Sequence, residues 1–238
     1  VKKLIQIIES DPKIGMVSGE SRLVKKGDLD SGEGLYWRYE CALKKNEAKV
    51  YSTICGTGAL FVIRRELFTE IETSSPDDYE RALNVLKNGY KVDYCADAFV
   101  KEDVSERTLD EFSRKIRIVT QEWQAMGRNV VLLNFFKFPI ESFFLISHKI
   151  IRWLVGLFYL VSLLSAVLIS NNLLVNLYLF INLIVVFLGY TGLFIENRGK
   201  QIKCLKLFTY WFAMNAISII ALFNAIKKRK YSTWKHSR

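Results

Sequence analysis

The division of this chain into a charged first part and an apolar second part constrains its fold more than any other feature. Three stretches of the second part carry almost no charge: 150–169 contains only Arg152, and 173–195 and 207–226 contain none. A helix rises about 1.5 Å per residue, so about 20 apolar residues cross the ~30 Å hydrocarbon core of a bilayer. The pattern predicts about three membrane helices after a polar unit, which therefore works at a membrane face.

The charge of the chain indicates a lipid surface as its partner. The formal net charge is +10, from 34 Lys and Arg against 24 Asp and Glu. In a soluble protein this excess would suggest nucleic acid, but basic residues beside apolar runs fit anionic headgroups and the positive-inside rule better. We therefore expect membrane lipids and no nucleic acid. The flanking basic residues are Arg198, Lys200, Lys203, Lys206 and those of 227–230.

Cysteine and histidine usage excludes several kinds of site. The four cysteines form no CxxC pair and no metal-ligand spacing, which favours a reducing cytosolic setting. The two histidines, His148 and His236, lie outside the polar half, so that half holds neither a histidine metal site nor a Ser-His-Asp triad. The sequence contains no signal peptide, and helical periodicity begins directly at Val1, so we expect the chain to continue something longer.

Strands and helices are predicted to alternate through the polar half, which indicates an α/β domain with a substantially parallel sheet. A polar loop is expected at 25–34. The apolar stretch 130–146 is broken by Lys137, Pro139 and Glu141 and suits one or two short interfacial helices better than a span. The predicted helices are 1–10, 35–49, 64–71, 77–88 and 109–126, and the predicted strands are 14–17, 59–63 and 91–96.

The acidic pair Asp77-Asp78 stands directly after Ser75-Pro76 at a predicted helix start. The exposed amides and the dipole of a helix N-terminus favour ionised carboxylates. A carboxylate held there can act as the general base for a hydroxyl, or bind a cation. Capping of the helix is the alternative, and for the pair taken alone it is the simpler explanation.

The segment Cys55-Gly56-Thr57-Gly58 lies just before a short apolar run. Glycine has no side chain and tolerates positive φ, so the backbone here can approach a ligand closely. An ordinary tight turn before a strand has the same composition. The segment indicates a binding loop only in combination with other features.

The predicted helix at 109–126 carries residues suited to a sugar nucleotide. Arginine favours planar, bidentate recognition of phosphate, and a tryptophan can stack on a sugar or a base. The alternatives are a solvated basic face and a core tryptophan. The residues concerned are Arg114, Lys115, Arg117, Gln121, Trp123 and Gln124.

The spacing of these features resembles that of the processive-type family 2 glycosyltransferases, which include cellulose, chitin and hyaluronan synthase-like enzymes and their bacterial relatives. CGTG at 55–58, followed by Arg64-Arg65, is similar to the family's FxCGT or GxG loop and the arginine after it. DDYE at 77–80, followed by NGYKV at 88–92, resembles the ED or TED motif with its downstream GYRV.

A third motif departs from the family pattern. RKIRI at 114–118 lies where the family has QxxRW; Arg117 keeps the arginine, but Arg114 replaces Gln and Ile118 replaces Trp. Because that tryptophan normally lines the acceptor path, processivity stays open. YWRYE at 36–40 also looks like a bacterial branch of the family.

The resemblance covers nearly the whole chain and implies its organisation. Residues 1–128 would form the C-terminal, acceptor-side half of a GT-A-like domain of α/β class, and 129–149 an interfacial amphipathic segment. Residues 150–226 would form about three transmembrane helices, and 227–238 a basic tail. The family's nucleotide-binding unit, with the DxD that holds Mg²⁺ or Mn²⁺, would precede Val1. We therefore expect no metal site in this chain, and no activity from this chain alone.

The resemblance also implies an activity. The enzyme would be an inverting glycosyltransferase of the inner membrane, with its catalytic part in the cytosol. It would transfer a sugar from a nucleotide-sugar to a glycan or lipid acceptor in polysaccharide or cell-envelope synthesis. The resemblance implies that the donor is a UDP-sugar. Asp78 would be the general base, and the substrate would contact Cys55, Gly56, Thr57, Gly58, Asp77, Arg114, Arg117, Trp123 and Gln124.

Two alternative functions and one conflict in the predicted membrane topology remain. The alternatives are a non-processive enzyme acting on a lipid, and a catalytically silent membrane scaffold or transport subunit. The conflict concerns topology: with a cytosolic catalytic part, two crossings leave 198–206 inside, but a third leaves the basic residues 227–230 outside, against the positive-inside rule. The length of 207–226 and its lack of charge nevertheless predict a full third crossing.

Overall fold

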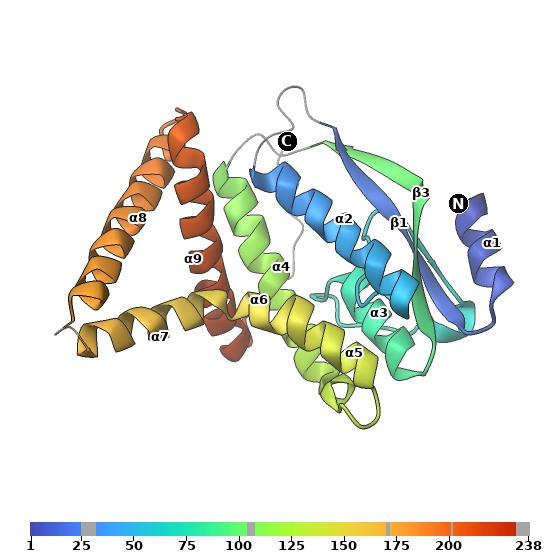
Figure 1. Cartoon of the computed structure of the whole chain (residues 1–238). Helices are drawn as coiled ribbons and strands as arrows, with labels where there is room; N and C mark the ends of the chain where they lie inside the picture. Colours follow the sequence, from blue (N-terminus) through green and yellow to red (C-terminus); the bar gives the residue numbers. More distant parts are fainter. Residues whose placement is uncertain (25–31, 104–107, 170–171, 201, 232–238) are drawn as a thin grey trace.

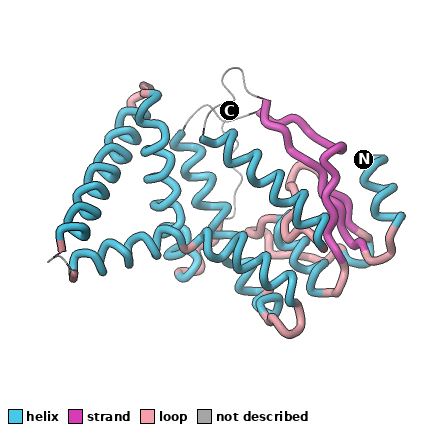
Figure 2. The backbone as a smooth tube through the Cα atoms, in the orientation of Figure 1, coloured by secondary structure: helices cyan, strands magenta, loops and turns pink. Residues whose placement is uncertain are grey.

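The structure is a computed structural model that describes residues 1–24, 32–103, 108–169, 172–200 and 202–231. Its first part is an α/β unit in which helices predominate over a small sheet (Figures 1 and 2). Its elements are α1 (Lys2–Ser10), β1 (Ile14–Val24), α2 (Gly32–Val50), β2 (Phe61–Ile63), the 3-10 turn η1 (Arg65–Leu67), α3 (Asp77–Lys87), β3 (Lys91–Asp103) and α4 (Thr108–Arg128).

The sheet has the strand order β2-β1-β3 and is mixed. β1 pairs with β3 in parallel, starting at Ile14 and Lys91, as expected for the predicted strands. β2 is antiparallel to β1, with Met16 opposite Ile63, so the prediction of a mainly parallel sheet holds for only one of the two pairings. β1 and β3 also run further than predicted, and the helix predicted at 64–71 is the single turn η1.

The main core lies around α3, whose Tyr79, Ala82, Leu83, Val85 and Leu86 are all fully buried. This spacing of three and four residues places them along one broad stripe of the helix. Gly89 ends α3 with a φ of +81°, a left-handed conformation that favours glycine. A smaller core lies between α1 and the sheet, so α1 covers one face while α2 and α3 lie on the other (Figure 1).

The second part begins with short helices where one or two were predicted. Pro139 stands at the start of α5, where its missing N–H costs nothing. The elements are η2 (Val130–Leu133), α5 (Pro139–Phe144), the π-helix η3 (Leu145–Ile150), α6 (Ile151–Trp153), α7 (Val155–Leu168), α8 (Leu173–Asn197), η4 (Lys203–Leu205) and α9 (Lys206–Ile226).

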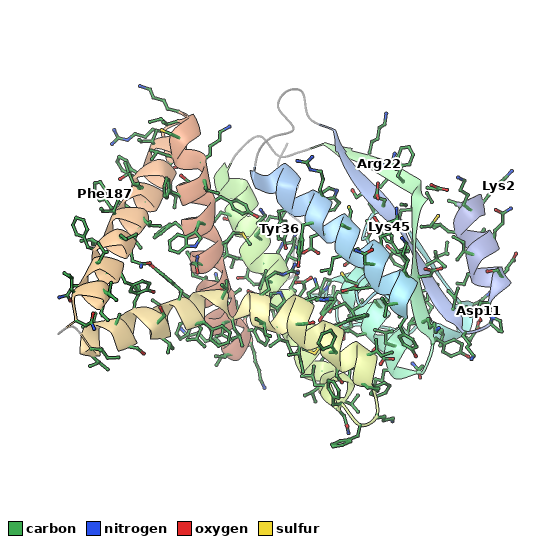
Figure 3. The ribbon with its side chains drawn as sticks, viewed as in Figure 1. Lys2, Asp11, Arg22, Tyr36, Lys45 and Phe187 are labelled. Carbon is green, nitrogen blue, oxygen red and sulfur yellow. The ribbon has the colours of Figure 1, made fainter. Side chains whose placement is uncertain are left out.

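Two helices, α8 and α9, are long and apolar enough to cross a membrane. The predicted span at 150–169 is interrupted: α7 follows the helical stretch Pro139–Trp153 at an angle of 57°, and the pair counts as a third candidate only when taken together. α8 is exposed along most of its length, and Phe187 points away from the rest of the molecule (Figure 3). α9 lies between α8 and α4 (Figure 1).

Candidate acceptor site

The acidic pair separates into an exposed and an inward-facing carboxylate at the start of α3. Asp77 is exposed, whereas Asp78 is half-buried and faces the loop of residues 55–58. The Gly56 N–H donates to the Asp78 carbonyl oxygen (3.2 Å). A Cβ added to Gly58 would lie 3.6 Å from Asp78 Oδ2, which shows how near the carboxylate is to the loop. The structure thus brings together the two motifs that the sequence placed 20 residues apart.

The two glycines of the 55–58 loop have different surroundings. A Cβ on Gly56 would come within 2.7 Å of Met16 Cε and 3.0 Å of the Asp78 carbonyl oxygen, so this position packs against the core. Gly58 is exposed, and a Cβ there would make only ordinary contacts. The open space beside the carboxylate therefore lies at Gly58, whereas glycine at 56 is required by packing.

Several charges act on Asp78. Burial, the largest cause, raises the pKa of its carboxyl above the ordinary value. Lys44 opposes this rise most strongly, Glu122 adds to it, and Lys149 opposes it. Burial also raises the pKa of the neighbouring Cys55 thiol to about 11, so Cys55 is a protonated thiol at neutral pH rather than a nucleophile.

One face of α2 supplies polar groups to the loop, and the sequence analysis did not single it out. Tyr36, Glu40, Lys44 and Glu47 recur at helical spacing, and Tyr36 lies on the side of α2 that faces α4 (Figure 3). Lys44 Nζ donates to the Gly56 carbonyl (2.6 Å) and to Thr57 Oγ1 (3.3 Å). The recurrence of polar residues every three or four positions within a predicted helix is the sequence signal that could have identified this face.

Glu47 fixes the chain just before the loop. Its Oε2 accepts from Thr53 Oγ1 (2.9 Å) and from the Ile54 N–H (3.3 Å), and its side chain is almost fully buried. The other oxygen, Oε1, lies 2.5 Å from His148 Nδ1. A buried carboxylate with three partners holds its surroundings in one arrangement, because each partner would be costly to lose.

Three basic residues of η3 and α6 pair with three acids of the first part of the chain. Besides the His148–Glu47 contact, Lys149 Nζ donates to Glu122 Oε1 (2.9 Å), and Arg152 binds Glu40. The sequence predicted an interfacial segment up to residue 149 and a membrane span from residue 150; the structure packs His148 and Lys149, at the end of that segment, against α2 and α4. The segment that leads to α7 is therefore joined directly to the surroundings of the loop.

The aromatic residue proposed to stack on a sugar lies in a different environment. The Trp123 ring packs 4.9 Å from that of Trp153, and both belong to the main core. This arrangement matches the core alternative that the sequence analysis left open for Trp123.

Two of the predicted site residues of α4, Arg117 and Gln124, lie near the C-terminal end of the described chain. Arg117 Nη1 donates to Gln121 Oε1 (3.3 Å), and Gln124 Nε2 donates to the Arg229 carbonyl (3.0 Å). Burial lowers the pKa of Arg117, and the nearby charge of Arg114 adds to this effect. These contacts place this side of α4 next to the basic residues that follow α9.

Two further charged residues of the recognised motifs have structural partners. Arg64 donates to the carbonyl oxygens of Ile14 (2.7 Å) and Ile8 (2.6 Å), which ties α1 to the sheet. Glu80 accepts from Arg128 Nη2 (2.7 Å), which joins the start of α3 to the end of α4. Asp78 is therefore the carboxylate of the DDYE segment that faces the loop without an arginine partner among the described residues.

The described residues do not fit a metal ion. No group of three or more His, Cys, Asp or Glu side chains in the described part of the chain is placed to hold one. The Mg²⁺ or Mn²⁺ that the family resemblance implies therefore has no ligand set among these residues.

The arrangement of helices and strands is similar to part of a solved glycosyltransferase structure. The structure is similar to that of the mannosyltransferase PcManGT from Pyrobaculum calidifontis, solved in complex with GDP-Man and Mn²⁺, with a TM-score of 0.61 and 16% sequence identity. The match covers 95% of this chain and 57% of the other, so the chain spans little more than half of its structural neighbour. No family model and no curated protein matches the sequence.

Proposed function

We propose that this chain is the acceptor-side part of a membrane-bound inverting glycosyltransferase that moves a sugar from a nucleotide-sugar to an acceptor hydroxyl. The observation that carries the proposal is the position of the Asp78 carboxylate, which lies beside Gly58 at the start of α3. The glycosyltransferase fold supports it, and so do the family 2 motifs. We place the enzyme in the inner membrane with the α/β part in the cytosol, where nucleotide-sugars are available, and in polysaccharide or cell-envelope synthesis.

The proposed reaction gives Asp78 one task. Its carboxylate takes the proton from the acceptor hydroxyl while the hydroxyl oxygen attacks the anomeric carbon. The bond from that carbon to the diphosphate breaks on the opposite side, so the configuration inverts. Burial raises the pKa of Asp78 and makes it a stronger base than an exposed aspartate, provided that it stays ionised at the working pH.

Donor binding is proposed from the resemblance and the structural neighbour. The neighbour's complex contains GDP-Man and Mn²⁺, and the family resemblance suggests a UDP-sugar with Mg²⁺ or Mn²⁺ held upstream. A divalent metal would neutralise the leaving diphosphate when bound. Arg114 and Arg117 remain candidates to assist, because arginine suits phosphate oxygens and both lie on α4.

A lipid acceptor is the second candidate, and one observation favours it. The 55–58 loop is joined through Lys44 and Glu47 to the face of α2 that binds η3 and α6, the elements that lead to α7. An acceptor anchored in the bilayer would reach the site along this side. Polymer and lipid acceptors use the same base, so the length of the product separates them.

The test is the replacement of Asp78 in the full-length protein. Asp78→Asn keeps the size of the side chain but removes the base, so transfer from labelled UDP-glucose, UDP-N-acetylglucosamine or GDP-mannose to membrane acceptors should fall by at least ~10²-fold. Donor binding, measured by calorimetry, should survive. Asp77→Asn is the matched control and should be mild, since Asp77 is exposed. Near-normal transfer by Asp78→Asn would refute the assignment, and a scaffold or transport subunit would show no transfer at all.

A further inference from the structure

Lys44 holds the turn that faces the proposed base. Its ammonium binds consecutive groups of the loop, the Gly56 carbonyl and the Thr57 hydroxyl. The backbone N–H of the same residue, Gly56, donates to the Asp78 carbonyl oxygen. One residue of the loop therefore contacts both the lysine of α2 and the aspartate of α3, so the position of the loop relative to Asp78 depends on both.

Among the described residues, Lys44 forms no ion pair with a carboxylate. The acids one turn away on the same face of α2 are bound by other residues, Glu40 by Arg152 and Glu47 by His148. In the described part of the chain, the hydrogen bonds of Lys44 go to a carbonyl and a hydroxyl. The positive charge of this ammonium therefore acts on the groups around it, Asp78 among them.

The other charges near Asp78 largely oppose one another. Glu122 comes from α4 and Lys149 from η3, and they bind each other at 2.9 Å, so their effects on Asp78 have opposite sign. Cys55, on the loop itself, is a protonated thiol. Among these described groups, Lys44 supplies the charge that the others leave uncompensated.

We propose that Lys44 is a positioning residue for the acceptor step: it fixes the Gly56-Thr57 turn against Asp78 and supplies the positive charge that keeps Asp78 ionised. The inference rests on the proposed function of Asp78 as general base. Its consequence is that loss of the charge at position 44 weakens the base at neutral pH by protonating it. Loss of a hydrogen bond alone does not have this effect.

The test is a titration of the Asp78 carboxyl in the full-length protein. Protein labelled with [4-¹³C]aspartate is observed by NMR, and the Asp78 signal is assigned by its loss in Asp78→Asn. In Lys44→Met the pKa of Asp78 should rise by about one unit, since a nearby opposite charge lowers a carboxyl pKa by roughly one to three. Lys44→Gln, which keeps a donor for Gly56 but not the charge, should show the same rise and serves if the Met variant does not fold.

Two controls fix the interpretation. Lys44→Arg keeps the charge and should leave the pKa of Asp78 near its wild-type value. Lys45→Met removes an exposed lysine from the neighbouring position and should leave it unchanged. In transfer assays the acid limb of the pH profile should move to higher pH by the same amount in Lys44→Met and Lys44→Gln.

The outcomes separate this inference from the proposed function. An Asp78 pKa that is equal in wild type, Lys44→Met and Lys44→Gln overturns the role of Lys44, even if transfer still depends on Asp78. Transfer that persists in Asp78→Asn overturns the proposed function instead, whatever the titration shows. The titration needs no knowledge of the sugar, so it can be read in either case.

Discussion

At the scale of residues, the surroundings of the 55–58 loop are held by buried ion pairs. Lys149 and Glu122 are the most enclosed of them, with side-chain exposures of 9% and 11%. The Lys149 ammonium also lies 5.1 Å from the centre of the Tyr79 ring. The desolvation of such a pair offsets much of its attraction, but one partner without the other leaves an unpaired buried charge.

We predict that Lys149→Met lowers the free energy of unfolding by about 3–5 kcal/mol, because Glu122 then loses its partner. The double variant Lys149→Met with Glu122→Leu should recover most of this loss. The measurement is urea unfolding of the detergent-solubilised full-length protein, followed by tryptophan fluorescence.

The exposed pair Lys3–Asp97 is the matched control, with side-chain exposures of 58% and 78%. Lys3→Met should change the free energy of unfolding by less than about 1 kcal/mol. If Lys149→Met were as mild as Lys3→Met, the pair would not be buried in the protein as it exists in solution.

At the scale of elements, the sequence predicted the order of strands and helices better than their partners. The start of α3 at Asp77 and its end before Gly89 follow from local chemistry, a proline and acids at one end and a left-handed glycine at the other. The antiparallel pairing of β2 could not be predicted, because strand direction depends on how the chain returns to the sheet. The site was predicted only in part for the same reason, since Lys44 reaches the loop from a separate helix.

The π-helix η3 could not be predicted from the spacing of apolar residues. A π-helix differs from an α-helix by one residue in its turn and leaves no mark in an apolar pattern. The sequence therefore predicted a continuous span from residue 150, whereas Arg152 pairs with Glu40 of α2 and the helix bends before α7.

The contact between α8 and α9 depends on glycine. A Cβ on Gly192 would lie 2.0 Å from Thr209 Oγ1 and 3.3 Å from Leu205 Cβ, and one on Gly189 would lie 2.6 Å from Phe212 Cβ. Small residues at such spacing let two apolar helices approach closely. We predict that Gly192→Val forces α8 and α9 apart and lowers the melting temperature of the detergent-solubilised protein by several degrees.

Leu183→Val, on an exposed part of α8, is the control for this prediction. It should leave the melting temperature, measured by fluorescence-detected size-exclusion chromatography after heating, close to that of the wild type. Equal melting curves for both variants would mean that α8 and α9 do not pack at Gly192.

At the scale of the whole molecule, α9 is packed against α4 of the α/β part. Lys115 of α4 lies 5.3 Å from the Tyr210 ring near the start of α9, and Gln124 binds Arg229 beyond its end. α9 therefore runs beside α4 (Figure 1), and the charges of α4 are too costly to place in hydrocarbon. Although α9 is long and apolar enough to span, we expect it to stay on the cytosolic side.

This arrangement removes the charge conflict found in the sequence. If α8 crosses the bilayer, if α7 crosses together with the bent stretch before it, and if α9 does not cross, both 198–206 and 227–230 lie in the cytosol, as the positive-inside rule requires. We predict that Cys204 and a cysteine introduced at Lys230 resist an impermeant thiol reagent in intact cells and react after lysis. Asn172→Cys, between α7 and α8, should react in intact cells.

Labelling of the cysteine at 230 from outside would show that α9 crosses after all. Labelling of Cys204 alone would instead show that α8 and α9 cross and α7 does not. Native Cys41, on α2 of the α/β part, reports whether the cells stayed sealed during the reaction.

The ion pairs between α2 and the segment from η3 to α6 also bear on when the first part of the chain can finish folding during synthesis. Glu47 and Glu40 are separated from His148 and Arg152 by 101 and 112 residues. While the ribosome is still making the intervening chain, these acids have been translated but their basic partners have not. The α/β part can therefore complete its fold only once the residues that lead to α7 have emerged, so we expect folding of the candidate site and insertion into the bilayer to be steps of a single process.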